Sequence, residues 1–407
     1  MRAFLDFFRR LHLVPQGITI VAAAFLPIFA IASMFPAVPT IIDHFAGDPD
    51  AKWKVPLMVS APGLTIAIFA PFAGYFADRF GRRPILLVAT FTYALFGTAP
   101  FFLESLNAVF ATRLLLGISE AAILTSVNTL IGDYWNEKRR RDWLFLQGIA
   151  GPFLASGVIL LAGPATAIRW NGMFLVYLVA VPIFLAMVAF LFEPKRDGVT
   201  VSEVVKAPTA SPFPTRSVAT IGAATLVASA LYYVFIINGG MAFREVGIID
   251  PKTLSKLTAT PSLCVMLGAL LFWLLGKQKS LVRLGTFFLL LGGGLAGLGL
   301  ASDYRWMIAA LCVQQTGAGM AVPSLIVWAQ EKLPFEHRGR GMGVWTACFF
   351  FGQFSSPWFV HLLNGAWGTM QGAFLVMGLG GVVAGLVAFL FLRRASPAPI
   401  LASETVA

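Results

Sequence analysis

Long apolar runs alternate with short polar segments along the whole chain. Each run is about 20 residues long and almost free of charge, which is the length that an α-helix needs to cross the hydrocarbon layer of a membrane. A membrane β-barrel would instead show segments of about 10 residues in which apolar and polar positions alternate, and runs such as residues 85–102 do not alternate. The pattern therefore predicts an all-α membrane protein.

About twelve runs are present, and a polar, proline-containing linker at residues 193–216 divides them into two groups of six. This layout predicts two six-helix bundles, related by pseudo-two-fold symmetry, that rock about a central site. We expect an amphipathic cytoplasmic segment at residues 1–15, bundles at residues 16–192 and 217–392, and a cytoplasmic tail at residues 393–407. The expected spans are residues 16–42, 55–77, 84–103, 107–134, 140–163, 168–192, 217–239, 258–276, 281–300, 304–333, 340–363 and 368–392.

Composition and charge agree with a membrane location. Hydrophobic residues make up 58% of the 407 residues and charged residues only 12%, whereas about a quarter of an average soluble domain is charged. Most of the 30 Lys and Arg lie in alternate loops and at the two termini, which is the positive-inside pattern. The net charge of +11 therefore indicates topology in an inner membrane, with both termini cytoplasmic, and not a nucleic-acid partner.

Several chemistries lack their sequence signatures. There is no G-x-x-x-x-G-K-[ST] phosphate loop, so we expect no ATP site. No H-E-x-x-H, paired-carboxylate or Ser/His/Asp pattern is present, and the three cysteines, Cys264, Cys312 and Cys348, lie in apolar runs without metal-ligand spacing. We expect neither an enzyme nor a cofactor or metal site.

The loop between the second and third spans, residues 74–83, reads GYFADRFGRR. Gly74 would remove a side chain where two helices cross closely, and Gly81 would permit a tight turn. Asp78 could face a helix N-terminus or an arginine, while Arg82 and Arg83 would anchor the cytoplasmic face. An incidental basic loop would explain the arginines but neither glycine nor the aspartate.

This loop matches the G-x-x-x-D-R-x-G-R-R signature at every fixed position and so resembles the major facilitator superfamily. The resemblance implies the twelve-helix major facilitator fold and a charge latch that joins Asp78 and Arg82 to the end of the fourth span and to the eleventh. The loop after the eighth span lacks the acidic residue, so we expect the latch mainly on the N-terminal half. The implied latch residues are Gly74, Asp78, Arg79, Gly81, Arg82, Arg83, Asp133, Arg338 and Arg340.

The fourth span contains Arg113-x-x-x-Gly117-x-x-x-Ala121, which resembles the basic motif of proton-driven members of the superfamily. Small residues four positions apart also serve plain helix packing, which is the alternative for Gly117 and Ala121. Arg113 is costly within a span unless it is paired, hydrated or snorkelling, and its place in the outer part of the helix leaves snorkelling open.

The fifth span, residues 147–157, reads QGIAGPFLASG and partly matches the g-x-x-x-G-P-x-x-G-G motif of drug:proton antiporters. The motif predicts a kinked helix with a flat packing face, although proline kinks occur in spanning helices of every function. The matching residues favour export, and they are Gly148, Gly151, Pro152 and Gly157.

Glu120 is the one acidic residue among 19 that the segmentation places near the middle of a span. Burial disfavours the charged carboxylate and favours its protonated form, as a proton carrier requires. Glu120 follows Arg113 by seven residues, so both should lie on one helix face about two turns apart. The alternative is a protonated carboxyl that is hydrogen-bonded to a neighbouring helix. The first span carries no acid except Asp43 at its outer end, unlike several exporters of cationic drugs in the superfamily, which leaves proton coupling to Glu120 and Arg113.

Further polar and aromatic residues lie at membrane depth and could either line an amphipathic substrate pocket or hold the bundle together. The candidates are Asn128, Tyr232, Tyr233, Asn238, Gln314, Gln315, Trp345, Phe349 and Gln353.

Together these features predict a monomeric secondary transporter that exports small amphipathic or aromatic molecules in exchange for protons, by alternating access. An uptake symporter of the same fold shares every feature except the motif of the fifth span. A non-transporting receptor or scaffold would need no buried titratable group.

Overall fold

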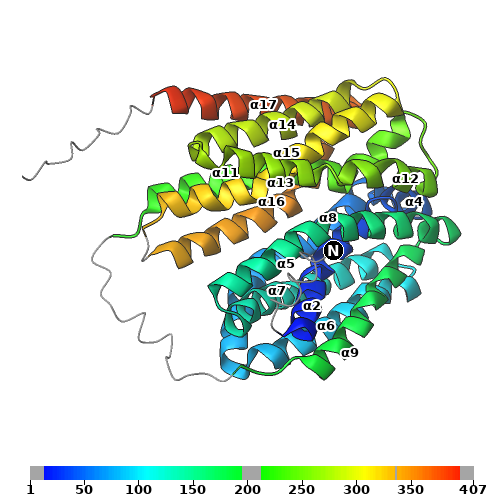
Figure 1. Cartoon of the computed structure of the whole chain (residues 1–407). Coiled ribbons are helices and arrows are strands. Elements are labelled where there is room, and N and C mark those ends of the chain that lie inside the picture. The colour runs from blue at the N-terminus through cyan, green and yellow to red at the C-terminus, as the bar shows by residue number, and fades with distance from the viewer. Residues whose placement is uncertain (1–12, 195–211, 335–336, 395–407) are drawn as a thin grey trace, which may run out of the picture.

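The computed structural model describes residues 13–194, 212–334 and 337–394. All regular elements in these ranges are helices, and they form two bundles that lie side by side (Figure 1). The expected amphipathic segment, most of the linker and the C-terminal tail lie outside the described residues. The boundaries of those three segments therefore stay predictions.

The first bundle precedes the linker. Its helices are α2 (Val14–Ala24), α3 (Leu26–Met34), α4 (Val38–His44), α5 (Ala51–Phe80), α6 (Arg82–Thr98), η1 (Ala99–Phe102), α7 (Leu106–Tyr134), α8 (Glu137–Ile168), η2 (Gly172–Val179) and α9 (Ala180–Phe190).

The second bundle follows the linker. Its helices are α11 (Thr215–Glu245), α12 (Pro251–Ser262), α13 (Val265–Leu274), η3 (Leu275–Lys277), α14 (Ser280–Leu300), α15 (Tyr304–Lys332), α16 (Arg338–Trp367) and α17 (Met370–Arg394).

The first expected span is not one helix but three consecutive segments. Pro27 lies at the start of α3 and Pro39 at the start of α4, and a proline nitrogen cannot donate the hydrogen bond that would continue the preceding helix. At the first break the Phe25 amide bonds the carbonyl of Ala22 (3.2 Å), three residues back. The prediction of a single helix over residues 16–42 was wrong, because prolines interrupt it within the span.

The eighth expected span begins earlier than residue 258 and is interrupted after Ser262. Asp250 caps α12, where its carboxylate accepts hydrogen bonds from the amides of Lys252 (3.3 Å) and Thr253 (2.9 Å). The Thr253 hydroxyl also donates to Asp250 (2.7 Å), and these bonds hold the pKa of that carboxyl below its usual range. A polar cap thus fixes the start of a helix whose first turns read as a loop in the sequence.

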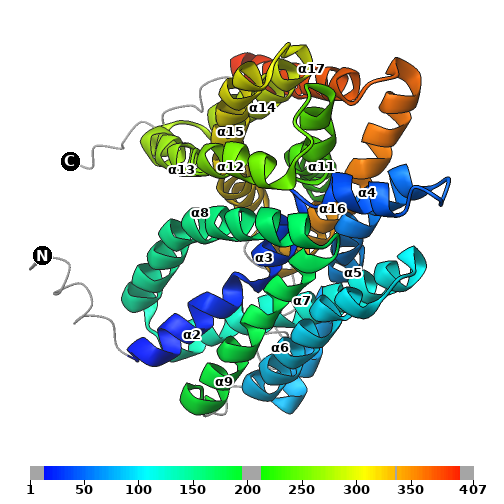
Figure 2. The same ribbon diagram turned by 90° about the vertical axis from the view of Figure 1, so that its right-hand side faces the viewer.

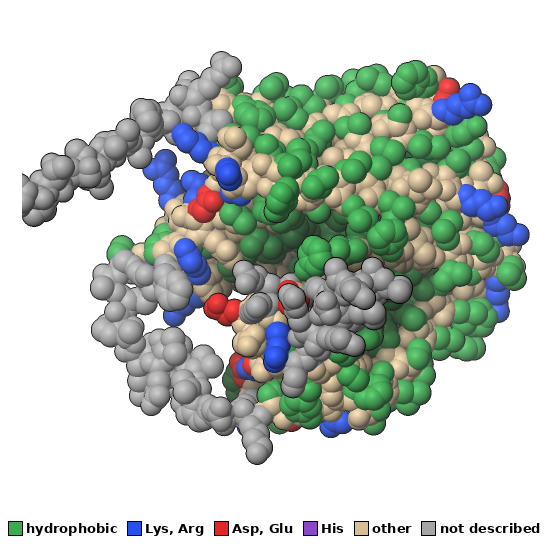
Figure 3. All heavy atoms as spheres, in the orientation of Figure 1, with side chains coloured by type: hydrophobic (Ala, Val, Ile, Leu, Met, Phe, Trp, Pro, Cys, Tyr) green, Lys and Arg blue, Asp and Glu red, His purple; other side chains and the backbone are tan. Residues whose placement is uncertain are grey.

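Eleven stretches among the described residues are long and apolar enough to cross a membrane. The remaining long helix, α16, has 30 residues and packs against α5, α11 and α17, but it falls outside that set. Apolar side chains cover the flanks of both bundles, while Lys and Arg gather at the two ends (Figure 3). The chain is a multi-pass membrane protein with the expected all-α fold.

Among the described residues, the two halves contact each other from the middle of the helices to one end. We name the end where α9 stops and α11 starts the linker end, and the opposite end, toward the viewer in Figure 2, the far end. Ser60 of α5 donates to the carbonyl of Phe354 of α16 (3.3 Å), and Ser156 of α8 donates to that of Ala259 of α12 (3.0 Å). The far end adds an ion pair and an aromatic contact across the halves: Asp43 with Arg244 (2.8 Å), and the rings of Trp53 and Trp358 (centroids 6.4 Å apart). These contacts lie from mid-helix to the far end, so the structure is closed there.

Candidate functional site

The signature loop is a tight turn whose amides are capped by a carboxylate. Gly81 has φ +99°, a conformation that L side chains rarely adopt, as the sequence predicts. Glu193 accepts hydrogen bonds from the amides of Arg82 and Arg83 (both 2.8 Å), which are the first donors of α6. Glu193 lies 110 residues away from Arg83 in sequence, and nothing in its sequence context revealed this role.

The expected reason for Gly74 was wrong. A Cβ there would meet only the Thr125 methyl group at 3.6 Å, an ordinary contact. The close crossing of α5 and α7 instead occurs at Gly117, where a Cβ would lie 2.5 Å from the carbonyl oxygen of Pro62. Gly117 therefore serves helix packing, the alternative that the sequence left open.

Arg82 forms the charged centre of the linker end in the first bundle. Its guanidinium pairs with Asp133 at the end of α7 and lies 3.8 Å from Asp78. Arg79 instead bonds the Tyr75 hydroxyl (3.3 Å). The extension of this latch to the second bundle stays a prediction. There Arg340 is exposed and Arg338 donates to the carbonyl of Leu333 (3.3 Å).

The second bundle has a matching ion pair that the sequence did not reveal. Arg283, near the start of α14, donates to Glu331 (3.2 Å), and Ser280 bonds the same carboxylate. Asp133 and Glu331 are each the second-last residue of a 29-residue helix, so the two pairs occupy corresponding places in the bundles. The sequence did not reveal this ion pair because Glu331 lies more than 40 residues after the loop that lacks the acid. That the latch lies mainly on the N-terminal half stays a prediction.

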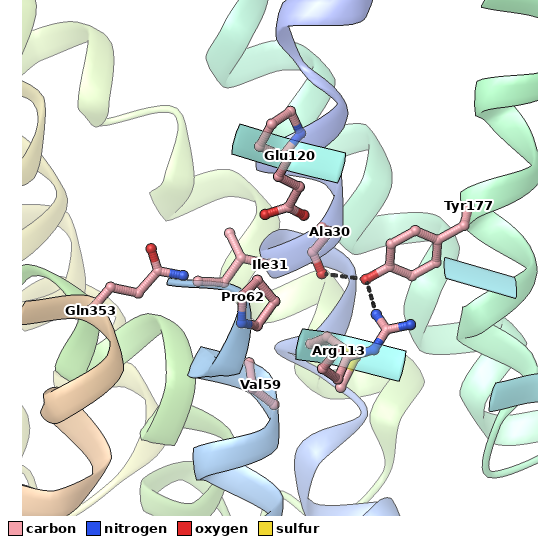
Figure 4. A pocket seen from close by; sticks show the side chains of 10 residues that line it. Ala30, Ile31, Val59, Pro62, Arg113, Glu120, Tyr177 and Gln353 are labelled. Atoms are coloured by element: carbon pink, nitrogen blue, oxygen red, sulfur yellow. Dashed lines mark hydrogen bonds between the residues drawn. The ribbon is translucent and has the colours of Figure 1, made fainter. Parts of the chain in front are cut away.

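Glu120 and Arg113 line the same cavity between the halves, as their spacing predicts (Figure 4). They are 3% and 1% exposed. Figure 4 shows the Glu120 carboxylate and the Gln353 amide pointing into the space between the labelled residues. The lining residues are Pro27, Ala30, Ile31, Met34, Val59, Pro62, Arg113, Glu120, Tyr177 and Gln353.

Arg113 does not snorkel to the membrane surface. Its guanidinium donates to the Tyr177 hydroxyl (2.7 Å) and to the carbonyls of Phe96 (2.9 Å) and Gly97 (3.1 Å). It also lies over the rings of Phe174 and Tyr177, at 5.1 and 4.9 Å. The terminal nitrogens of this buried cation are thus held by carbonyl oxygens and a phenol, whereas its Nε has no hydrogen-bond partner among the described residues.

Two tyrosines near this cation were not predicted from the sequence. Tyr177 and Tyr93 are buried, and their ring centroids are 5.4 Å apart. In the sequence they are two aromatic residues among many in apolar runs, so only the tertiary structure singles them out.

Glu120 keeps one oxygen without a hydrogen-bond partner among the described residues. The cavity beside it measures about 10 Å³, about the room that one water molecule occupies. Gln353 is the one lining residue that comes from the second bundle. It reaches the cavity because Gly63 of α5 lets α16 approach: a Cβ on Gly63 would lie 2.8 Å from the Phe350 carbonyl oxygen. The carboxyl therefore lies at the contact between the halves.

Four of the substrate-site candidates form an aromatic cluster on α11 and α16. The rings of Trp345 and Phe349 stack at 5.3 Å, and those of Tyr232 and Tyr233 lie 6.3 and 5.9 Å from Phe349. Trp345, Phe349 and Gln353 follow one another at four-residue spacing, so they share a helix face that leads to the Glu120 cavity. The structure brings these five candidates together.

The remaining candidates lie elsewhere. Asn128 is exposed, and Asn238 donates to the carbonyl of Val234 (3.3 Å) in its own helix. Gln314 packs against Gly294 of α14. A Cβ on Gly294 would lie 2.4 Å from the backbone nitrogen of Gln314. Gln315, next to it on α15, is buried. These four residues stay predictions as substrate contacts.

The expected flat face of the fifth span is only partly present. A Cβ on Gly151 would lie 3.1 Å from the Phe25 ring, but Gly148 and Gly157 face open space within 4 Å. Helix α8 runs without interruption through Pro152, and Ser156 makes its polar contact with α12. The glycines at 148 and 157 are thus not required for packing in this conformation.

Comparison with known protein families identifies the chain. The model of the Major Facilitator Superfamily matches residues 20–278 and 249–406. The chain belongs to the Major Facilitator Superfamily. This family of transporters accounts for the two bundles and for the signature loop.

Curated relatives include both efflux and solute-carrier proteins of the superfamily. The chain is 31% identical over 144 residues to the class E tetracycline resistance protein of Escherichia coli (34% of this chain, 33% of the relative). It is 32% identical over 157 residues to solute carrier family 22 member 1 of Bos taurus (38% of this chain, 27% of the relative). The matched segments span about a third of these relatives.

Solved structures of the superfamily share the fold at low sequence identity. A mutant of the nucleoside transporter NupG superposes with a TM-score of 0.72 at 13% identity, covering 93% of this chain and 99% of that one. An auto-inhibited POT family peptide transporter gives 0.68 at 13% identity, with 94% and 98% covered. These likenesses establish the fold and no substrate.

Proposed function

We propose that this chain is a proton-coupled antiporter that exports small amphipathic or aromatic molecules across the inner membrane of a bacterium. The observation that carries the proposal is a buried acid, Glu120, with a buried cation, Arg113, in a cavity between the halves. Charge burial of this kind is costly in a membrane and marks ion pathways. The protein works as a monomer with the proton gradient as its energy source.

The distribution of Lys and Arg supports a cytoplasmic location for the linker end and both termini. The far end is then external, and this structure is closed to the outside. Alternating access requires these far-end contacts to open while the linker-end surfaces close. The ion pair of Arg82 with Asp133, and its counterpart Arg283 with Glu331, would keep each bundle rigid during that motion.

The proposed substrate class is supported by Gln353, which lines the cavity, and by the aromatic cluster on the same face of α16. The cluster of Tyr232, Tyr233, Trp345 and Phe349 offers flat aromatic faces, and Gln353 offers an amide donor and acceptor. Export is supported by efflux relatives, among them multidrug resistance protein 1 of Bacillus subtilis, which is 29% identical over 142 residues. An uptake symporter is the second candidate, because solved neighbours include a nucleoside transporter and peptide transporters.

The test uses purified protein in liposomes of one orientation that enclose a pH-sensitive dye. Tetracycline and ethidium serve as probes, and a pH gradient is imposed in either direction. We expect each transported probe to move against the proton flux, and Glu120→Gln to abolish gradient-driven transport while exchange of probe for probe persists. Glu104→Gln, which changes an exposed acid, is the matched control.

Movement of a probe together with protons would replace antiport by symport. Gradient-driven transport by Glu120→Gln at the wild-type rate would remove Glu120 as the proton carrier. Transport of neither probe by the wild type, with no dye response over a wider panel of aromatic compounds, would contradict the proposal as a whole.

A further inference from the structure

Two buried phenols hold the middle segment of the broken first span. Tyr93 of α6 donates to the carbonyl of Leu26 (2.5 Å), and Tyr177 of η2 donates to that of Ala30 (3.0 Å). The two carbonyls are four residues apart, so they lie one turn apart on one face of α3. Helix α3 is therefore fixed to the first bundle by two equivalent bonds, although Phe25 and the prolines separate it from α2 and α4.

Only one of the two phenols also contacts the buried cation. The Tyr177 oxygen accepts a hydrogen bond from Arg113 (2.7 Å) while its proton goes to Ala30, and Figure 4 shows these two bonds meeting at the hydroxyl oxygen. A phenol oxygen can accept one bond and donate another at once. The hydroxyl of Tyr177 thus connects the guanidinium directly to the backbone of α3.

Helix α3 also forms one wall of the Glu120 cavity, through Pro27, Ala30, Ile31 and Met34. Its position decides how the carboxyl is enclosed.

The other charged and titratable groups around the carboxyl are few. Arg113 shares its helix, Tyr93 and Tyr177 come from α6 and η2, and Tyr233 of α11 is close enough to interact with its charge. The remaining lining residues are apolar apart from the neutral Gln353. Arg113 is the one cation in this set, so it must respond when Glu120 gains or loses a proton.

We propose that Tyr177 is a positioning residue that transmits the charge state of Glu120, through Arg113, to α3 of the first span. A charged Glu120 attracts the Arg113 guanidinium and pulls on the hydrogen bond that the guanidinium donates to Tyr177. A protonated Glu120 releases it and leaves Arg113 on its carbonyl and phenol anchors. Because the Tyr177 hydroxyl is bonded to the carbonyl of Ala30, each shift of the guanidinium also displaces α3, which forms one wall of the cavity. This inference rests on the proposed proton coupling.

The matched pair Tyr177→Phe and Tyr93→Phe tests it. Each variant keeps the aromatic ring. The ring of Tyr177 is needed for packing, because it lies so close to α6 that a Cβ on Gly97 would be 2.3 Å from it. Each variant also removes one bond to α3, but only Tyr177→Phe removes one of the three hydrogen bonds that hold Arg113. Without that bond the guanidinium can approach Glu120 and favour its charged form, so more acid is needed to protonate the carboxyl.

We expect the proton concentration for half-maximal transport to rise about tenfold in Tyr177→Phe and to stay at the wild-type value in Tyr93→Phe. A tenfold shift corresponds to about 1.4 kcal/mol, within the range of one hydrogen bond to a charged group. Probe-for-probe exchange at equal pH on both sides reports folding and substrate binding in each variant. In a Glu120→Gln background, where only probe-for-probe exchange persists, Tyr177→Phe should leave the pH profile of that exchange unchanged.

Equal shifts in both tyrosine variants, or no shift in Tyr177→Phe, would overturn the inference while the wild type still couples to protons. A wild type without proton coupling would instead contradict the proposed function. If Tyr177→Phe does not fold, Arg113→Lys replaces it, because a single ammonium group cannot keep all three anchors. An unshifted pH profile in Arg113→Lys would then overturn the inference.

Discussion

The two walls of the central cavity are built from different chemistry. The first bundle contributes the charges, Glu120 and Arg113, with Tyr177 as a hydrogen-bond partner of the cation. The second bundle contributes the neutral amide of Gln353, which shares a helix face with the stacked rings of Trp345 and Phe349, and no acid or base among its described lining residues. The difference suggests a division in which one half carries the proton and the other recognises the substrate. The following changes test that division, from the largest expected effect to the smallest.

Removing the cation of the first bundle should have the largest effect. Arg113→Ala leaves two carbonyls and a phenol without their donor, and bonds to a charged group contribute about 1.5–3 kcal/mol each. We expect gradient-driven transport to fall about 100-fold and the thermal midpoint to drop. Arg305→Ala, which removes an exposed charge, should leave both unchanged. Wild-type coupling in Arg113→Ala would end the proposed division.

Adding a methyl group at the contact between the halves should have the second-largest effect. In Gly63→Ala the new Cβ would lie 2.8 Å from the Phe350 carbonyl oxygen, and overpacking of this kind costs about 1–3 kcal/mol. We expect the far end to open, so that a membrane-impermeant maleimide labels Ser60→Cys about tenfold faster. Gly148→Ala, whose Cβ has open space, is the matched control. Equal labelling in both would show that Gly63 does not govern closure.

Truncating the aromatic cluster should weaken substrate binding without changing proton coupling. Phe349→Ala removes a ring that contacts Trp345, Tyr232 and Tyr233, and such contacts are worth about 0.5–1.5 kcal/mol. The KM for a transported probe should rise up to about tenfold, with an unchanged pH profile. Phe359→Ala on the same helix changes an exposed ring and serves as control. A shifted pH profile in Phe349→Ala would show that the second bundle also governs the proton.

The smallest effect is expected at Gln314, which is fully buried and has no hydrogen-bond partner for its amide among the described residues. Replacing such a group by an apolar one of similar size is neutral or stabilising, so Gln314→Leu should raise stability by up to about 1 kcal/mol. Transport should be unchanged. A higher KM would restore Gln314 to the substrate site.

Sequence reasoning identified features that depend on local pattern. The long helices α5, α7 and α15 lie within a few residues of their expected bounds, because charge-free runs with polar ends mark them clearly. Glu120 and Arg113 were found because charge is rare inside a span. Tyr177 and Glu193 were not, since their roles arise from contacts 64 and more than 100 residues away. The breaks in the first span were missed because prolines are tolerated in membrane helices, so their presence alone does not end one.

The approach of Gln353 over Gly63 has an evolutionary consequence. The amide carbon of Gln353 would lie 3.1 Å from any Cβ at position 63, so the two positions share one small volume although 290 residues separate them. Spatial neighbours of this kind change together. In an alignment of this lineage, positions 63 and 353 should covary, with larger residues at 63 accompanied by shorter side chains at 353.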